Sequence, residues 1–305
     1  MIRKNPPARP EEEVRKTGRQ LMFRIRKVLN HNSVIALNSD DQQMYLILGK
    51  GIGFNRKPTE RIETRPEDTM YSLKETSERG EAMAIVKDVA PECLEVADSI
   101  LNAAEKEFGR IDRSILFPMA DHIAFAVQRM KKKEEIRNPL NADIQLLFHT
   151  EYKVAQCASA LIHDAFHVDI SNDEIGYIAL HVHTAIEDEK VSEALKTAEL
   201  VRFCISLIEQ ETGRHIEVMS LGYNRMMNHI RFMVRRILTD EPLNLNLNQY
   251  MKEHYPLSYE IAQRICDELG RGMKRSYHEA EIGYLAMHIE RVLGNDPEGT
   301  SSDKL

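Results

Sequence analysis

Cysteine is scarce in this chain and tryptophan is absent. The four cysteines are widely scattered and form no Cys-x-x-Cys pair; they are Cys93, Cys157, Cys204 and Cys266. This pattern suits a reducing cytosol, and it argues against both a disulfide framework and a zinc site. The sequence therefore predicts no structural metal and no other cofactor.

Long apolar runs are also missing. No stretch approaches the roughly 20 apolar residues that a membrane-spanning helix needs. The first twenty residues contain Glu11, Glu12 and Glu13 and no apolar segment, so they are not a signal peptide. We expect a cytoplasmic protein without membrane insertion.

Familiar catalytic motifs are absent as well. The chain has no P-loop, no Gly-x-Ser-x-Gly and no Gly-x-Gly-x-x-Gly pattern, so an enzyme with a nucleotide or acyl-transfer site is disfavoured. His163 and His167 have the i,i+4 spacing of metal ligands but lack the glutamate of the His-Glu-x-x-His motif. His181 and His183 are two residues apart and would point away from each other on a helix. We predict that the chain is not an enzyme.

The net charge of −7 conceals an uneven distribution. Residues 1–77 hold 15 Lys and Arg against 10 Asp and Glu, a balance of +5, and the rest of the chain carries −12. A basic N-terminal segment on an acidic body indicates a nucleic-acid partner for that segment.

The N-terminal part has the pattern of short strands. Four apolar runs, separated by Asn, Asp and Gly, predict strands at 23–29, 34–37, 44–48 and 70–73. We expect a small antiparallel β domain over residues 22–77, after an N-terminal extension of residues 1–21. A polar linker over residues 78–88 would follow.

Helical periodicity begins near Val89. Two long amphipathic stretches, 89–108 and 192–211, are followed by Gly109 and Gly213, which are typical helix-ending residues.

An internal repeat organises this helical body. A shift of 107 residues places residues 121–130 on 228–237 with five of ten positions identical. The same shift places residues 174–182 on 281–289 with six of nine identical. We expect two tandem all-α helical-bundle regulatory domains, residues 89–190 and 191–296, and a C-terminal tail of residues 297–305.

The repeat also sorts the twelve histidines. His122 falls on His229 and His181 falls on His288, while other histidines such as His163 and His183 meet different residues. Chance retention of a half-polar core residue would not preserve two unrelated pairs at one spacing. We predict that these four histidines are functional.

Their surroundings suggest phosphoryl chemistry. Each first histidine is followed at i+3 by a phenylalanine and at i+7 by an arginine, on one helix face. In the first copy these are Phe125 and Arg129, and in the second they are Phe232 and Arg236. A guanidinium matches phosphate oxygens, and neutral imidazole is a nucleophile that can accept a phosphoryl group. Ser171 and Glu174 have the spacing of an N-terminal capping box on the helix of His181.

Two segments of the β domain fit RNA. Asn30 and Asn32 lie in a Lys-Val-Leu-Asn-His-Asn-Ser-Val stretch, and residues 49–54 read Gly-Lys-Gly-Ile-Gly-Phe. Asparagine amides can bond base edges or 2′-hydroxyls, glycines permit close backbone approach, and Phe54 offers a stacking face. An ordinary hairpin and turn would explain the same residues.

Together, the two segments and the repeated motifs Asp-His-Ile-Ala-Phe-Ala-Val-Gln-Arg, Gly-Tyr-Ile-Ala-Leu-His, Asn-His-Ile-Arg-Phe and Gly-Tyr-Leu-Ala-Met-His carry a resemblance. Over residues 22–295 the chain resembles the transcriptional antiterminators of sugar-utilisation operons, typified by the β-glucoside operon antiterminator. The resemblance implies a coantiterminator RNA-binding domain and two phosphotransferase-system regulation domains.

The resemblance also implies a mechanism. A homodimer would hold a hairpin in the leader mRNA that overlaps a terminator. The histidine-containing phosphocarrier protein and a sugar permease (enzyme II) component would phosphorylate the four histidines. By position, RNA contacts would fall on Lys27, Asn30, Asn32, Gly49, Gly51 and Phe54. The alternatives are a DNA-binding activator with the same regulatory domains and a phosphotransfer enzyme.

Overall fold

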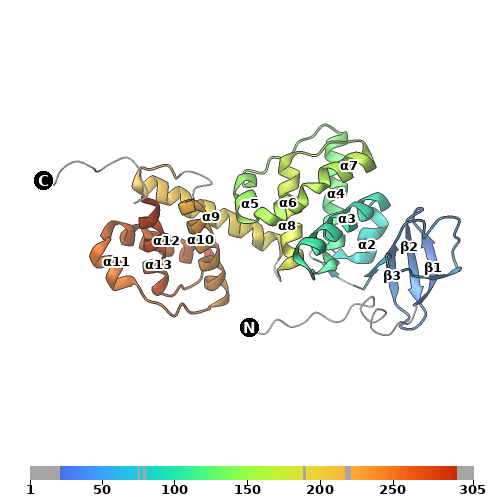
Figure 1. The fold of residues 1–305 in the computed structure, drawn as a ribbon, viewed down its shortest axis with the longest axis horizontal. Helices are drawn as coiled ribbons and strands as arrows, with labels where there is room; N and C mark the ends of the chain where they lie inside the picture. Colours follow the sequence, from blue (N-terminus) through green and yellow to red (C-terminus); the bar gives the residue numbers. More distant parts are fainter. Residues whose placement is uncertain (1–20, 75, 78–79, 188–189, 217–220, 294–305) are drawn as a thin grey trace. The chain divides into compact units, whose positions relative to one another are not determined.

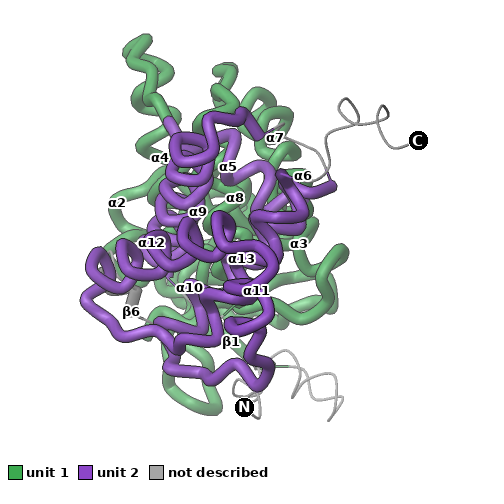
Figure 2. The backbone as a smooth tube through the Cα atoms, turned by 90° about the vertical axis from the view of Figure 1, so that its left-hand side faces the viewer, with its two compact units in different colours: residues 1–138, 150–188 green, residues 139–149, 189–305 purple. Residues whose placement is uncertain are grey.

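The computed structural model describes residues 21–74, 76, 77, 80–187, 190–216 and 221–293. The chain divides into two compact units (Figure 2). Unit 1 comprises residues 1–138 and 150–188, and unit 2 comprises residues 139–149 and 189–305.

Unit 1 begins with a five-stranded antiparallel sheet (Figure 1). The strand order is β4-β1-β2-β3-β5, and the strands are β1 (Met22–Val28), β2 (Ser33–Asn38), β3 (Met44–Leu48), β4 (Arg61–Glu63) and β5 (Thr69–Ser72). The four predicted strands are therefore confirmed, while β4 was not predicted. Its three residues present only one buried side chain, Ile62, which is too short a pattern to detect.

Alternating burial explains how β1 joins the core. Phe23 and Ile25 are buried while Arg24 and Arg26 are exposed, as expected for a strand with one apolar face. The pairing with β2 shifts after Ile25, which marks a bulge before Lys27.

Both faces of the central strands are buried. Val34, Ala36, Tyr45 and Ile47 belong to the main cluster of buried residues in the sheet. Ile35, Leu46 and Tyr71 are paired side by side, so they share the opposite face, and they too are buried. Tyr71 contacts Phe117 of a helix edge to face, with the ring centroids 6.1 Å apart. The helical part of unit 1 thus covers this second face.

The predicted linker contains regular structure. β6 (Thr76–Ser77) pairs with β7 (Gly80–Glu81), and helix α2 (Ala82–Asp88) follows directly. The sequence predicted only a polar linker over residues 78–88, because Ala82, Ile85 and Val86 form a buried face too short to show a clear period.

The remaining helices of unit 1 surround an apolar core. They are α3 (Pro91–Phe108), the 3-10 turn η1 (Arg113–Ile115), α4 (Leu116–Lys131), α6 (His149–Ala155), α7 (Cys157–Phe166) and α8 (Asn172–Ile186). α3 packs on α4 and α7, and α4 packs on α8. Helix α3 ends at Gly109, whose φ of 81° favours glycine, as the sequence predicted.

Within its described residues, unit 2 contains helices joined by loops and no strands. Its helices are α5 (Asn141–Leu147), α9 (Val191–Thr212), α10 (Leu221–Thr239), α11 (Asn248–His254), α12 (Pro256–Met273) and α13 (Ala280–Leu293). α13 packs on α10, α11 and α12. Helix α9 ends at Gly213 in the left-handed region, again as predicted. Arg202 of α9 holds α5 through an ion pair with Asp143 at 3.2 Å.

No described helix combines the length and the apolar character that crossing a bilayer requires.

Candidate functional site

The four repeated histidines come together as two pairs, one in each unit. His122 of α4 and His181 of α8 have ring centroids 5.5 Å apart. His229 of α10 and His288 of α13 are stacked, with centroids 4.4 Å apart and planes at 20°. The structure therefore pairs the two repeated histidines within each copy, from helices far apart in the sequence, and it does so in both copies.

Tyrosine supplies the aromatic neighbour of each pair. Tyr177 lies 5.7 Å from His122, and Tyr284, its counterpart under the repeat, lies 5.1 Å from His229. The predicted flank was Phe125, but that side chain is 49% exposed. Tyr177 precedes His181 by one helical turn, so both face the first histidine from α8.

Each predicted arginine binds a buried glutamate. Arg129 donates from Nε and Nη2 to Oε1 of Glu174, at 3.0 and 2.7 Å. Arg236 donates to both carboxylate oxygens of Glu281, at 2.6 and 2.7 Å. Glu174 and Glu281 are 0% and 1% exposed. The paired guanidinium makes burial of each carboxylate tolerable.

The sequence predicts a different role for Glu174, as the second residue of a capping box. Ser171 Oγ accepts a hydrogen bond from the Glu174 backbone N–H at 3.3 Å, so half of the predicted capping box is present. The Glu174 side chain does not complete the box, because its carboxylate reaches Arg129 instead. The repeat could have indicated this second role, because the 107-residue shift places Glu174 on an identical residue, Glu281.

The two pairs differ in the charge beside the first histidine. Nε2 of His122 lies 3.1 Å from Oε2 of Glu174. Burial raises the pKa of Glu174, but the contact with His122 and the hydrogen bonds from Arg129 outweigh burial and hold that pKa below its usual value. This carboxylate is therefore ionised at neutral pH.

The second pair is held neutral. Burial, followed by the nearby His288 and Arg236, lowers the pKa of His229 to about 3. Burial and the positive charges of Arg291 and Arg225 lower the pKa of His288 to about 4. Within the described residues, Nε2 of His229 is buried and has no hydrogen-bond partner. A neutral imidazole nitrogen of this kind is a nucleophile at physiological pH.

Unmatched histidines have separate surroundings. His183 is buried and its Nδ1 lies 3.0 Å from Glu151, whereas His163 is largely exposed with Asp169 at 2.9 Å. His167 ends helix α7 in the left-handed region. In the part of the chain that the structure describes, no three His, Cys, Asp or Glu side chains are grouped as metal ligands.

The two predicted RNA segments lie side by side in loops at the ends of β1, β2 and β3. Asn32 Oδ1 accepts a hydrogen bond from the Gly51 N–H, and the Asn32 carbonyl accepts one from the Gly49 N–H, both at 2.9 Å. The Gly53 N–H bonds the His31 carbonyl at 2.9 Å. A Cβ on Gly53 would lie 2.2 Å from the Asn30 carbonyl oxygen, so only glycine fits there.

Side chains at the edges of this loop cluster, residues 30–32 and 49–54, are exposed. Phe54 is 56% exposed and contacts His31 edge to face, and Lys27 at the end of β1 is also exposed. An ion pair that no local sequence pattern predicts lies next to the loop. Asp68 is buried and pairs with Arg65 at 2.8 Å, and Arg65 also donates to the Lys50 carbonyl.

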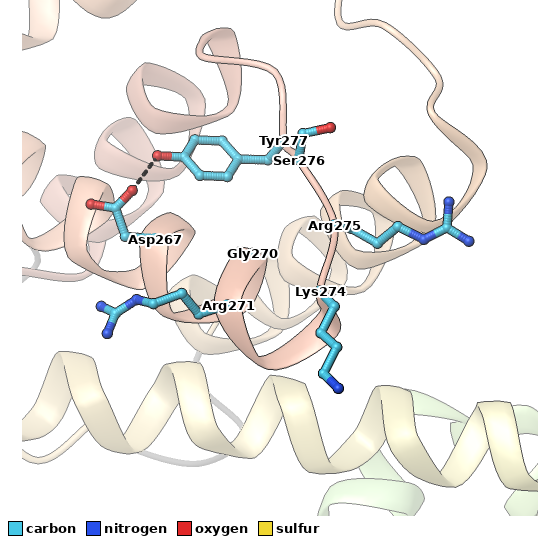
Figure 3. Close-up of a pocket in the computed structure, with 7 residues that line it drawn as sticks. All are labelled: Asp267, Gly270, Arg271, Lys274, Arg275, Ser276 and Tyr277. Carbon is cyan, nitrogen blue, oxygen red and sulfur yellow. Dashed lines mark hydrogen bonds between the residues drawn. The ribbon is translucent and has the colours of Figure 1, made fainter.

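A surface hollow in unit 2 lies outside both kinds of site. Figure 3 shows its lining, in which the Tyr277 hydroxyl donates to Asp267 at 2.6 Å. Arg271 in the same lining is paired with Glu268. None of the predicted site residues lines this hollow.

Family models match nearly the whole described chain. A CAT RNA-binding domain model matches residues 23–80, and a PRD domain model matches twice, over residues 98–185 and 202–292. The chain belongs to the CAT–PRD family of transcriptional antiterminators. All four histidines lie within the two PRD matches, and the loop cluster lies within the CAT match.

Curated relatives of this CAT–PRD chain are similar over almost their full length. The GlcA/glcB genes antiterminator of Staphylococcus carnosus is 28% identical over 91% of this chain and 98% of the relative. The β-glucoside operon antiterminator of Dickeya chrysanthemi is 26% identical over 92% of this chain and 100% of the relative. A solved structure, titled crystal structure of GlcT CAT-PRDI, is 28% identical with a TM-score of 0.47. The match covers 54% of this chain and 98% of the chain in that structure.

The expected fold class is confirmed. A small antiparallel sheet matching the CAT domain precedes a mostly helical region that matches two PRD domains.

Proposed function

We propose that this CAT–PRD protein binds a hairpin in the leader mRNA of a sugar-utilisation operon and prevents termination of transcription. The loop cluster of residues 30–32 and 49–54 would contact the RNA, together with Lys27. Phosphoryl groups on His122, His181, His229 and His288 would regulate that binding. The RNA-binding domain would span residues 22–77, and the two regulatory domains would span residues 89–190 and 191–296.

One observation carries the proposal: the same His–His–Arg–Glu arrangement occurs twice, in two matches to one regulatory domain model, downstream of one RNA-binding domain model. A catalytic role would not require two buried copies. We propose that the chain receives phosphoryl groups and is not itself an enzyme. It would act in the cytoplasm, as a homodimer beside the nascent transcript.

The geometry suggests how a phosphoryl group would be received. The lone pair of a neutral imidazole nitrogen forms a bond to phosphorus while the donor's bond to phosphorus breaks, and the donor keeps that electron pair. The donors we propose are the histidine-containing phosphocarrier protein and the sugar permease (enzyme II) component. Arg129 and Arg236 would orient the phosphate, because a guanidinium bonds two phosphate oxygens at once.

Phosphorylation would also rearrange the charges. A phosphoryl group on Nε2 of His122 would carry nearly two negative charges within reach of the Glu174 carboxylate. Repulsion would separate the two anions, and Arg129 would exchange Glu174 for the phosphate. Since the Arg129–Glu174 pair links α4 to α8, this exchange would loosen the packing of those helices.

A DNA-binding activator was the alternative. Its helix-turn-helix would have to occupy the N-terminal segment, where the structure has a five-stranded sheet and the CAT model matches.

Sequencing the RNA recovered with the full-length protein tests the proposal. We expect enrichment of one or a few leader hairpins that overlap a terminator upstream of sugar-utilisation genes. Recovery of RNA with no shared hairpin, or of none above a mock purification, would contradict RNA-directed antitermination.

A further inference from the structure

In the side-chain amides of Asn30 and Asn32, the carbonyl oxygen and the NH₂ group have different partners. The Asn30 carbonyl oxygen accepts hydrogen bonds from the Asn32 N–H and the Ser33 hydroxyl, at 2.9 and 2.8 Å. The Asn32 carbonyl oxygen accepts from Gly51. These bonds shape the loop and use the acceptor ends. The NH₂ groups are left as the donors with which either asparagine could recognise RNA.

A single carboxylate of α3 binds both donor groups. Asn30 Nδ2 donates to Glu95 Oε1 at 2.7 Å, and Asn32 Nδ2 donates to Glu95 Oε2 at 3.1 Å. Glu92, one turn earlier on α3, lies 3.4 Å from the same Asn30 nitrogen. Both hydrogens of the Asn30 amide therefore have carboxylate acceptors nearby.

A second set of bonds holds the sheet against the same face of α3. Residues 95, 98, 102 and 105 follow the 3-4-3 spacing of one helix face. Asp98 accepts hydrogen bonds from Thr69 and Tyr71 of β5. Arg113, only 7% exposed, donates to Asp98, Tyr71 and Asn102 at 2.7, 2.7 and 2.9 Å. The contact of Glu95 with the loop is thus part of a continuous polar interface within unit 1.

Carboxylate and RNA would compete for the same hydrogens. RNA offers phosphate oxygens, 2′-hydroxyls and base carbonyls as acceptors, and each needs the amide donors that Glu95 now holds. The charges of Glu92 and Glu95 would also repel the RNA backbone at short range. Binding RNA through Asn30 and Asn32 therefore requires these asparagines to leave α3.

We infer that Glu95, assisted by Glu92, competes with RNA for Asn30 and Asn32 and so sets the RNA affinity of the full-length chain. This inference rests on the proposed RNA-binding function. Glu95 acts through the asparagines and has no contact with RNA in this account. Its removal should strengthen RNA binding, an effect that simple loss of structure would not produce.

The test compares the full-length chain with two matched variants, E95A and E107A. Glu107 is an exposed glutamate at the other end of α3, so E107A makes the same change in net charge on the same helix. The probe is an RNA hairpin that full-length E95A selects from a pool with randomised loops. Fluorescence anisotropy at one fixed salt concentration then measures the dissociation constant for each protein.

We expect E95A to bind the hairpin about tenfold more tightly than the wild type, because charge-assisted hydrogen bonds no longer compete. E107A should stay within about twofold. Should E95A fold poorly, E95Q keeps the side-chain volume and removes the charge, and we expect about threefold tighter binding. Equal affinities for E95A and wild type, weaker binding by a folded E95A, or equal gains in E95A and E107A would each overturn the inference.

Failure of the proposed function gives a different result. If neither the wild type nor E95A selects any hairpin above background, RNA binding itself is contradicted and the inference falls with it. If both bind one hairpin with the same constant, RNA binding stands and only the competition by Glu95 is overturned.

Discussion

Nε2 of His122 lies 3.1 Å from Oε2 of Glu174, a fully buried carboxylate that also binds Arg129. The matching glutamate of the second module, Glu281, gives both oxygens to Arg236, and His229 stacks on His288. The two copies therefore use the same residue types, but in the first a carboxylate oxygen lies beside the first histidine, whereas in the second both carboxylate oxygens bind the arginine.

Removing the charge of Glu174 should favour phosphorylation of His122. In E174Q the phosphoryl group would no longer approach a carboxylate, while the glutamine oxygen could still accept a hydrogen bond from Arg129. We expect the rate of phosphate incorporation at His122 to rise severalfold. Site-resolved mass spectrometry measures this rate, and His229 in the same protein is the internal control. A fall at His122, or equal changes at both histidines, would contradict the competition between Glu174 and phosphate.

The Arg236–Glu281 pair should matter for stability. Glu281 is 1% exposed, so E281A would leave Arg236 without its carboxylate in a largely buried position. We expect a loss of about 3 kcal/mol in the free energy of unfolding of unit 2. The exposed Arg271–Glu268 pair provides the control, since R271A should cost less than about 1 kcal/mol. Urea titration measures both, and equal shifts of the transition would be inconsistent with a buried pair of this importance.

The second histidine pair predicts a pH dependence of stability. In the folded protein the pKa values of His229 and His288 are about 3 and about 4, while unfolded histidine titrates near 6.5. The unfolded chain therefore binds protons first as the pH falls from about 6.5 towards 4, and stability is lost over that range. Between pH 7 and 5 each of the two histidines should cost about 2 kcal/mol.

Replacing His288 tests this dependence. H288Q should reduce the loss of stability between pH 7 and 5, measured as the difference in urea midpoint, and H149Q should leave the difference unchanged because His149 is exposed. An unchanged pH dependence in H288Q would show that His288 takes up its proton without hindrance in the folded state.

The glycines of the loop cluster predict a local defect. In G53A the new Cβ would meet the Asn30 carbonyl at 2.2 Å and displace the loop that carries the predicted RNA contacts. We expect the RNA affinity to fall more than tenfold. The free energy of unfolding of the helical parts of the chain should stay unchanged. G272A is the control, because a Cβ there meets nothing within 4 Å. Wild-type RNA affinity in G53A would exclude this loop from the RNA-binding surface.

Local patterns in the sequence predicted most of the fold. Apolar runs predicted β1, Gly109 and Gly213 predicted the ends of α3 and α9, and the repeat singled out the four histidines that the structure arranges in two pairs. The partners of those histidines were harder to predict. Glu174 has the spacing of a capping residue, and only the folded chain shows that its side chain reaches Arg129, 45 residues away.

The other contacts that the sequence did not predict are polar contacts between residues far apart in the chain. Glu95 looks like an ordinary solvent-facing residue of an amphipathic helix, and nothing near it in the sequence indicates Asn30 or Asn32 as partners. The same holds for Arg113, whose bonds to Tyr71 and Asp98 join segments that periodicity treats separately. Such pairs depend on how elements pack, which no local pattern specifies.

Phosphate incorporation into the full-length protein tests whether the four repeated histidines accept phosphoryl groups. The wild type, a variant with His122, His181, His229 and His288 changed to alanine, and a control with four unmatched histidines changed are each incubated with phosphorylated phosphocarrier protein. The control changes are H149A, H163A, H215A and H254A. We predict acid-labile phosphate on the wild type and the control and none on the first variant. Undiminished phosphate on that variant, once its folding is verified, would contradict the assignment of the repeated histidines as phosphoryl acceptors.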